Sequence, residues 1–84
     1  PTLYASDLEM SYKDGSTFNA TVLDGQGNPL KDAIVKFNIN GIFYNHKTDS
    51  NGIAMLNITL MSSKYIITSE YDGLKVSNTI TIKD

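Results

Sequence analysis

The chain has no cysteine and no tryptophan, and its seven basic residues are all lysine, so arginine is missing too. Without cysteine, neither a disulfide nor a thiolate metal site can form. The lack of arginine and a net charge of −2 disfavour a nucleic-acid partner, because such proteins usually carry a basic stripe. No apolar run approaches the ~20 residues of a membrane-spanning helix. We therefore expect no membrane insertion of this domain.

The 84 residues are enough for one small domain with a thin core. The chain begins at Pro1 rather than at a methionine, so we expect residues 1–84 to be one module of a longer polypeptide. Isoleucine, asparagine, threonine and serine are abundant, and this composition favours strands and turns over helices.

Apolar and polar residues alternate with a period of two in seven segments, while helical periodicity is nearly absent. Phe18, Ala20 and Val22, for example, share one face of their segment. The sequence therefore predicts an all-β fold of about seven antiparallel strands, packed as two sheets so that neither apolar face is left uncovered. The predicted strands span residues 8–12, 16–24, 33–39, 42–47, 53–60, 65–71 and 76–82.

Paired turn residues fix the register of one predicted hairpin. Asn40-Gly41 favours a two-residue type I′ turn, which places Ile39 opposite Ile42. In that register Phe37 faces Tyr44, and Val35 faces His46. Asp72-Gly73 predicts a second turn, before the last strand.

The only histidine invites a metal hypothesis, which the pattern does not support. His46 is one imidazole in a chain without thiolates, whereas zinc requires three or four converging nitrogen or sulfur ligands. Asn45 next to it points to the other face of the strand. We therefore interpret His46 as a partly buried structural residue.

Two Asp-containing loops raise the question of calcium. The loop at Asp49-Ser50-Asn51-Gly52 starts like a calcium loop but lacks its further acidic ligands and its closing glutamate. Turn chemistry explains it better, with Asp49 as a cap and Asn51-Gly52 at positive φ. The other loop contains Asp24, Asn28 and Asp32, and Pro29 and the neighbouring glycines already account for it. We predict no metal and no cofactor.

Motifs for catalysis are missing as well. The chain shows no glycine-rich phosphate loop, no nucleophile elbow and no close pair of carboxylates with a base. We therefore expect no enzymatic activity and assign no catalytic residue.

Four motifs carry a resemblance that covers nearly the whole chain: an Asp-x-x-Gly-x-Pro-Leu loop, a Thr-Asp-x-Asn-Gly-x-Ala turn, a Tyr-x-Ile-x-x-x-Tyr strand and a terminal Ser-Asn-Thr-Ile-Thr-Ile. With them, the chain resembles the Ig-like repeats of archaeal, methanogen-type adhesin-like surface proteins, and is similar to bacterial Ig-like (Big) domains. The motifs begin at Asp24, Thr48, Tyr65 and Ser77.

The resemblance implies an Ig-like β-sandwich with Greek-key connections, and in such sandwiches the Tyr65 hydroxyl would tie down the connection before its strand. It also implies a stalk or spacer repeat at the extracellular cell surface, with neighbouring Ig-like repeats of the same chain as partners. The alternative is an accessory module that binds a carbohydrate, or a glycan or protein of a cell surface. Exposed aromatic residues are the signature of this alternative, and the candidates are Phe43, Tyr12 and Tyr4.

Two Asn-x-Thr sequons, at Asn19 and Asn57, are candidate glycosylation sites. By alternation both side chains point away from the core, on strands that are neighbours in an Ig-like sheet. Asparagine and threonine are abundant, so chance sequons are the alternative explanation.

Asn78 shares the parity of the core positions of its strand, so its amide needs buried partners. In some surface Ig-like domains a lysine condenses with such an asparagine, assisted by an acid, and the resulting isopeptide bond stabilises a thin core. The candidates are Lys13 with Asp7 or Glu9. Lys13 lies at the far end of the first strand and Asn78 opens the last strand, so a parallel pairing of these two strands keeps them apart. This favours an ordinary hydrogen-bonded amide instead.

Overall fold

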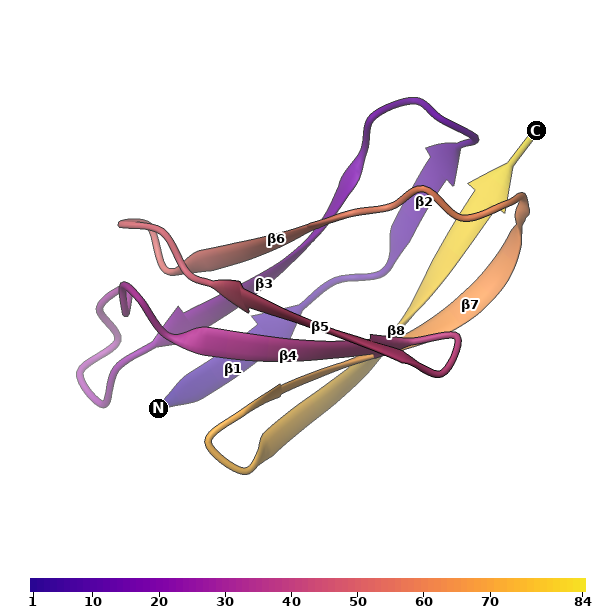
Figure 1. Cartoon of the computed structure of the whole chain (residues 1–84). Coiled ribbons are helices and arrows are strands. Elements are labelled where there is room, and N and C mark those ends of the chain that lie inside the picture. Colours follow the sequence, from indigo (N-terminus) through magenta and orange to yellow (C-terminus); the bar gives the residue numbers. More distant parts are fainter.

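The computed structural model describes all residues, 1–84, and is built from strands without any helix (Figure 1). No segment therefore forms a helix long and apolar enough to cross a membrane. The eight strands are β1 (Thr2–Ala5), β2 (Leu8–Ser11), β3 (Thr17–Leu23), β4 (Ile34–Ile39), β5 (Ile42–Lys47), β6 (Ile53–Asn57), β7 (Ser63–Tyr71) and β8 (Leu74–Lys83).

The strands form two sheets, which confirms the all-β, two-sheet prediction. One sheet has the order β1-β3-β6 and the other the order β2-β8-β7-β4-β5. The number of strands differs from the prediction of about seven, because the structure has eight. β2 pairs with β8 in parallel, which is the pairing of the first and last predicted strands from which the separation of Lys13 and Asn78 was expected.

The additional strand arises because the N-terminal segment contributes to both sheets. Leu3 of β1 pairs with Val22 in the smaller sheet, whereas Leu8 of β2 pairs with Ile80 in the larger one. The crossover between them consists of Ser6 and Asp7. The apolar alternation changes phase at this crossover, and that change is the sequence signal that the prediction missed.

Two-residue turns form both predicted hairpins. Asn40 and Gly41 have φ values of 55° and 77°, and they join β4 to β5 with Ile39 opposite Ile42. Asp72 and Gly73 have φ values of 50° and 80°, and they join β7 to β8. Positive φ at both central residues gives a turn whose twist matches that of the flanking strands. The predicted register of β4 and β5 is therefore confirmed.

The turn before β6 differs from the prediction. Only Gly52 has a positive φ, 75°, and Asn51 does not. The loop is held by Asp49 instead, whose Oδ1 accepts hydrogen bonds from the backbone N–H groups of Asn51 (2.9 Å) and Ile53 (3.1 Å). One carboxylate thus satisfies two donors of the turn, as expected of a capping aspartate.

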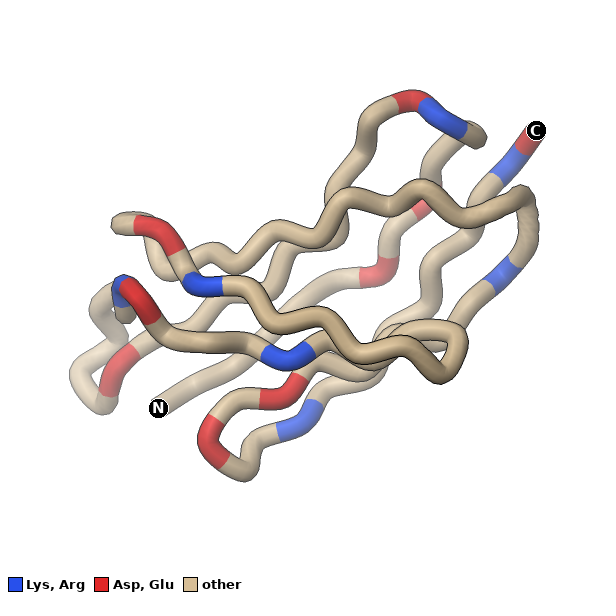
Figure 2. The backbone as a smooth tube through the Cα atoms, viewed as in Figure 1, with Lys and Arg blue, Asp and Glu red and all other residues tan.

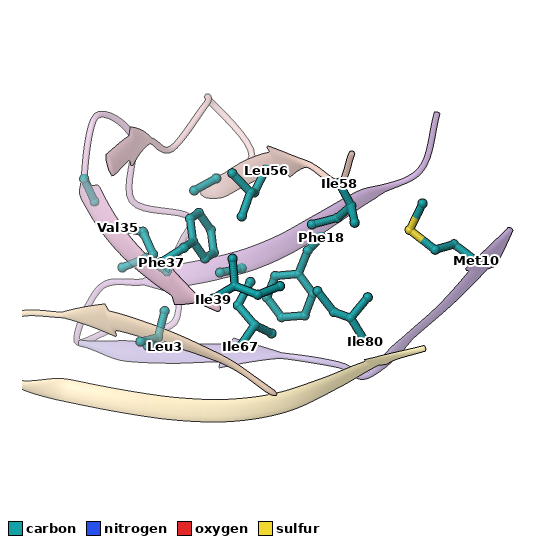
Figure 3. Packing of buried hydrophobic residues seen from close by; sticks show 14 of the residues in the cluster. Leu3, Met10, Phe18, Val35, Phe37, Ile39, Leu56, Ile58, Ile67 and Ile80 are labelled. Atoms are coloured by element: carbon teal, nitrogen blue, oxygen red, sulfur yellow. The ribbon is translucent and has the colours of Figure 1, made fainter. Parts of the chain in front are cut away.

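The core lies between the two sheets (Figure 3). Phe18 of β3 and Phe37 of β4 meet edge to face at its centre, with their ring centroids 6.0 Å apart. Such a pair adds about 0.5–1.5 kcal/mol beyond the burial of its surface. The fully buried side chains include Val22, Val35, Ile67, Ile80 and the polar Ser69.

The molecule is elongated, with extents of 41 × 21 × 17 Å, and the two ends of the chain lie at opposite ends of it (Figure 1). Thr2 pairs with Leu23 beside the loop that follows β3. Lys83 pairs with Ser11 at the other end, beside the turn that follows β2. A chain that enters at one end thus leaves at the other.

Candidate functional site

Both sequon asparagines are exposed on the outer face of the smaller sheet. Asn57 at the end of β6 pairs with Thr17, and Asn19 of β3 pairs with Met55. The Thr17 hydroxyl donates a 2.8 Å hydrogen bond to Asn19 Oδ1. The amide nitrogen of Asn19, to which a glycan would be attached, has no hydrogen-bond partner within the chain. Glycosylation at either site stays a prediction.

Asn78 contacts the crossover between β1 and β2. Its Nδ2 donates to the carbonyl of Ala5 (3.3 Å) and to Asp7 Oδ1 (3.1 Å), and the backbone N–H of Thr79 donates to the same Asp7 oxygen (3.0 Å). The buried Oδ1 of Asn78 has no partner. The expectation of a hydrogen-bonded amide is thus met on the nitrogen side only.

These hydrogen bonds set the protonation of Asp7. The pKa of its carboxyl is lowered below its ordinary value, first by the Thr79 backbone N–H and then by the Asn78 amide. Donors stabilise the charged form of a carboxylate, so Asp7 is ionised at neutral pH.

The structure does not bring Lys13 to Asn78. Lys13 follows β2, beyond the pairing of Ser11 with Lys83, and its Nζ lies 5.3 Å from the centre of the Tyr12 ring. The two side chains sit at opposite ends of β2, as expected, so the geometry does not support an isopeptide bond between Lys13 and Asn78. The second candidate acid, Glu9, forms an ion pair with Lys83 instead, with 3.8 Å between Glu9 Oε1 and Lys83 Nζ.

The candidate aromatic contacts are exposed but far apart. Phe43 is 61% exposed on the outer face of β5, with Lys36 Nζ 5.5 Å from its ring centre. Tyr12 is 42% exposed after β2. Because β2 and β5 are the two edges of the larger sheet, these rings cannot form one binding surface.

The histidine and the Asp loops show turn and core contacts. His46 is half-buried, with its ring centre 6.2 Å from that of Phe37. Asp24 Oδ1 accepts hydrogen bonds from the backbone N–H groups of Asn28 and Gln26, both 2.9 Å, and they lower the pKa of its carboxyl. The structure contains no group of three His, Cys, Asp or Glu side chains placed to hold a metal ion. Lysines and acids are interspersed over the molecule, so neither sign forms a large patch of its own (Figure 2).

Sequence reasoning missed a cleft of about 310 Å³ beside the crossover. It combines the exposed ring of Tyr4 with the polar side chains of Asp7 and Asn19. Its lining comes from β1, the crossover, β2, β3 and β6, and the sequence pattern alone does not bring these segments together. The other lining residues are Ala5, Ser6, Leu8, Thr17, Phe18, Thr21 and Ile53.

No model of a known family and no curated protein matches the chain. Among solved structures, a carbohydrate acetylesterase from Xanthomonas citri is similar in fold, with a TM-score of 0.64 and 13% sequence identity. The match covers 90% of this chain and 17% of that one. At this identity the similarity concerns the fold alone, and the chain corresponds to a small part of the esterase.

Proposed function

We propose that the chain is an Ig-like module of an adhesin-like surface protein and acts as a stalk or spacer repeat. Its strand order supports the Ig-like assignment, because β3, β4, β7 and β8 are placed as the B, C, F and G strands of that fold. Crossings between sheets after β3 and after β6 agree with Greek-key connections. The Tyr65 hydroxyl donates to the carbonyl of Met61 (2.8 Å), which agrees with a tyrosine corner.

The observation that carries the proposal is the path of the chain along the molecule. The two ends lie at opposite ends of a body 41 Å long. Tension between them pulls β2 toward one end and β8 toward the other, and these two strands are parallel neighbours. Their hydrogen bonds are then loaded together in shear instead of opening one after another. This arrangement suits a spacer that must keep its length under tension.

Force spectroscopy on a chain of identical copies tests the proposal. Pulled end to end, each copy should unfold in one step that adds roughly 250 Å, the extended length of 84 residues less the folded length. As a control, pulling through Ser62 and Asp84 loads two positions at the same end, because Ser63 pairs with Ile82. That geometry should open β7 and β8 pair by pair at a clearly lower force. Equal forces in both geometries would remove the support for a spacer role.

The surface setting belongs to the same proposal: an extracellular stalk at the cell surface, whose partners are neighbouring repeats. Mass-spectrometric sequencing of the full-length polypeptide from its native cell tests it. Similar modules on either side, and release of their peptides from intact cells by added protease, are the expected results. A single copy fused to a hydrolase would contradict the stalk. We assign no catalytic role to the chain.

The second candidate is an accessory module that binds a carbohydrate or a cell-surface protein. Phe43 favours it, because it is a large exposed ring on an edge strand. Substitution Phe43→Ala should then abolish binding of the protein to intact cells. The control is Ile66→Ala, which removes another exposed apolar side chain from the larger sheet. Cell binding that survives Phe43→Ala contradicts a role for this ring.

A further inference from the structure

We propose that the cleft at the crossover binds one pyranose ring of a saccharide, stacked against Tyr4. The cleft lies beside the outer face of the smaller sheet, where Tyr4 is paired with Thr21 and Thr21 with Ile53. This site is distinct from the exposed ring of Phe43, which belongs to the larger sheet. The inference does not depend on the spacer role.

Tyr4 supplies the apolar surface. It is 51% exposed, and its hydroxyl makes no hydrogen bond within the chain, so the ring is available to a ligand. The C–H face of a pyranose is apolar and packs well on an aromatic ring, whose electron-rich face attracts the C–H groups. Ile53, half-buried in the same cross-strand row, extends this surface.

A hydrogen-bond acceptor and a hydrogen-bond donor line the same cleft. Asp7 is oriented by the Asn78 and Thr79 donors at its Oδ1, which leaves its Oδ2 without a partner as an acceptor for sugar hydroxyls. Asn19 is oriented by Thr17 at its Oδ1, which leaves its Nδ2 free as a donor. A sugar hydroxyl both donates and accepts, so a fixed acceptor and a fixed donor next to an aromatic ring suit it.

Size and charge argue for a single neutral ring. A volume of about 310 Å³ is at the small end of ligand sites. No lysine lines the cleft, and Asp7 is negative, so an anionic ligand is disfavoured. The ring can come from two sources: a free saccharide, or a glycan on Asn19 itself, in which case Asn19 Nδ2 is the point of attachment instead of a free donor. The other sequon provides a comparison, because the hollow beside Asn57 contains no aromatic residue.

The first arm of the test uses free saccharides. The amide signals of the unglycosylated, isotope-labelled protein are followed by NMR during titration with cellotetraose and with the tetramer of N-acetylglucosamine. Saturable shifts should appear at Tyr4, Asp7 and Thr21. Tyr4→Ala should weaken binding about five- to tenfold, and Tyr4→Phe, which keeps the ring, should bind nearly as well. Phe43→Ala serves as the control and should bind like the unchanged protein.

The second arm uses an attached sugar and exploits the absence of cysteine. Asn19→Cys and Asn57→Cys each introduce a unique thiol, which is alkylated with the iodoacetamide of N-acetylglucosamine or with iodoacetamide alone. The sugar on residue 19 should raise the thermal midpoint relative to plain alkylation and shift the Tyr4 signal. Both effects should vanish with Tyr4→Ala. The sugar on residue 57 should produce neither.

Binding in the first arm identifies a site for a free saccharide. A raised thermal midpoint and a shifted Tyr4 signal in the second arm alone identify a site that binds the protein's own glycan. Either result supports the proposed pyranose site. No shift in the first arm together with equal behaviour of residues 19 and 57 in the second overturns it. The force measurements decide the spacer role separately, so the two proposals can fail independently.

Discussion

At the scale of single residues, the loop before β6 depends on a glycine that packs against backbone. A Cβ on Gly52 would lie 2.6 Å from the carbonyl oxygen of Val22 and 3.1 Å from the N atom of Leu30. Gly73 has a similar φ, +80°, but nothing lies within 4 Å of the corresponding position. The two glycines therefore separate the conformational cost of positive φ from the cost of close packing.

We predict that Gly52→Ala destabilises the fold more than Gly73→Ala. The second change should cost about 1–2 kcal/mol of unfolding free energy, the penalty for a Cβ in the left-handed region. The first should cost at least about 2 kcal/mol more, because backbone must move to relieve the contacts. Urea denaturation of both variants measures the difference. Equal values would mean that the loop moves away without cost.

Thr48 makes a second residue-scale prediction. Its buried hydroxyl donates to the carbonyl of Leu30 and accepts a 2.9 Å hydrogen bond from the Ala33 N–H, which joins the loops at one end of the sandwich. Thr48→Val keeps the volume but leaves both backbone groups unpaired, so we expect a loss of about 2–4 kcal/mol. Thr48→Ser, which keeps the hydroxyl, should lose clearly less. Similar urea midpoints for the two variants would contradict this role.

Asp7 makes stability depend on pH. Hydrogen bonds lower its pKa in the folded state below the ordinary 3.8, so its contribution is present above that pH and is lost as the pH falls through the folded pKa. Asp14 and Asp24 act in the same direction. Asp7→Asn should therefore reduce the drop in urea midpoint between about pH 5 and about pH 2.5. An unchanged drop in this variant would show that Asp7 is not one of the groups responsible.

Residue chemistry was predictable where a local rule decides it. Asn40-Gly41 allows few alternatives between two apolar strands. The Tyr65 hydroxyl donates to the carbonyl of Met61 in the connection before its strand, as expected. The same rule failed at Asn51, because Asp49 already holds that turn and only Gly52 needs the positive φ. Of the partners of Asn78, Asp7 was one of the two candidate acids, whereas the carbonyl of Ala5 was not predicted, since no local rule links residues more than seventy positions apart.

At the scale of the element, alternation located the strands because each has one face on the core. It failed where the chain changes sheets: the first strand is predicted at residues 8–12 and none at Thr2–Ala5, whose alternation has the other phase. The cleft is formed at this crossover together with β3 and β6, so the candidate site was missed for the same reason.

The edge strand β5 makes a prediction about association. Ile42, Phe43 and Tyr44 are all exposed, and Lys47 is its only charged residue. Since Ile39 and Ile42 flank the turn as a hydrogen-bonded pair, alternation directs the backbone groups of Phe43 and Asn45 away from β4. Such an edge can pair with a second copy.

Asn45→Glu should reduce that self-association, because it adds a charge to the edge and faces Lys36 on β4. Its effect on unfolding free energy should be within about 0.5 kcal/mol. Gln26→Glu adds the same charge to an exposed loop and is the control for net charge. Sedimentation of both variants at high concentration measures the effect. If the loop variant dissociates as well, general repulsion and not the edge is responsible.

At the scale of the whole molecule, two layers were predictable because seven short amphipathic strands must cover each other's apolar faces. The way in which tension between the chain ends loads the strands was only partly predictable. It depends on β2 and β8 being parallel neighbours and on which end of the sandwich each chain end reaches, and both follow from long-range pairing.

This geometry predicts that one hydrogen bond at the end of β2 affects mechanical more than thermodynamic stability. The backbone N–H of Tyr12 donates to the carbonyl of Lys83 at 2.7 Å, and Tyr12→Pro removes this donor. When the chain is pulled end to end, this bond is loaded together with the other hydrogen bonds between β2 and β8. The unfolding force of Tyr12→Pro should therefore be lower than that of the unchanged protein. The force measured through Ser62 and Asp84 should stay the same, because that geometry opens β7 from β8.

Tyr12→Ala keeps the backbone N–H and controls for the loss of the tyrosine ring. An end-to-end force lowered as much by Tyr12→Ala as by Tyr12→Pro would show that the side chain, and not the shear of β2 against β8, resists the tension.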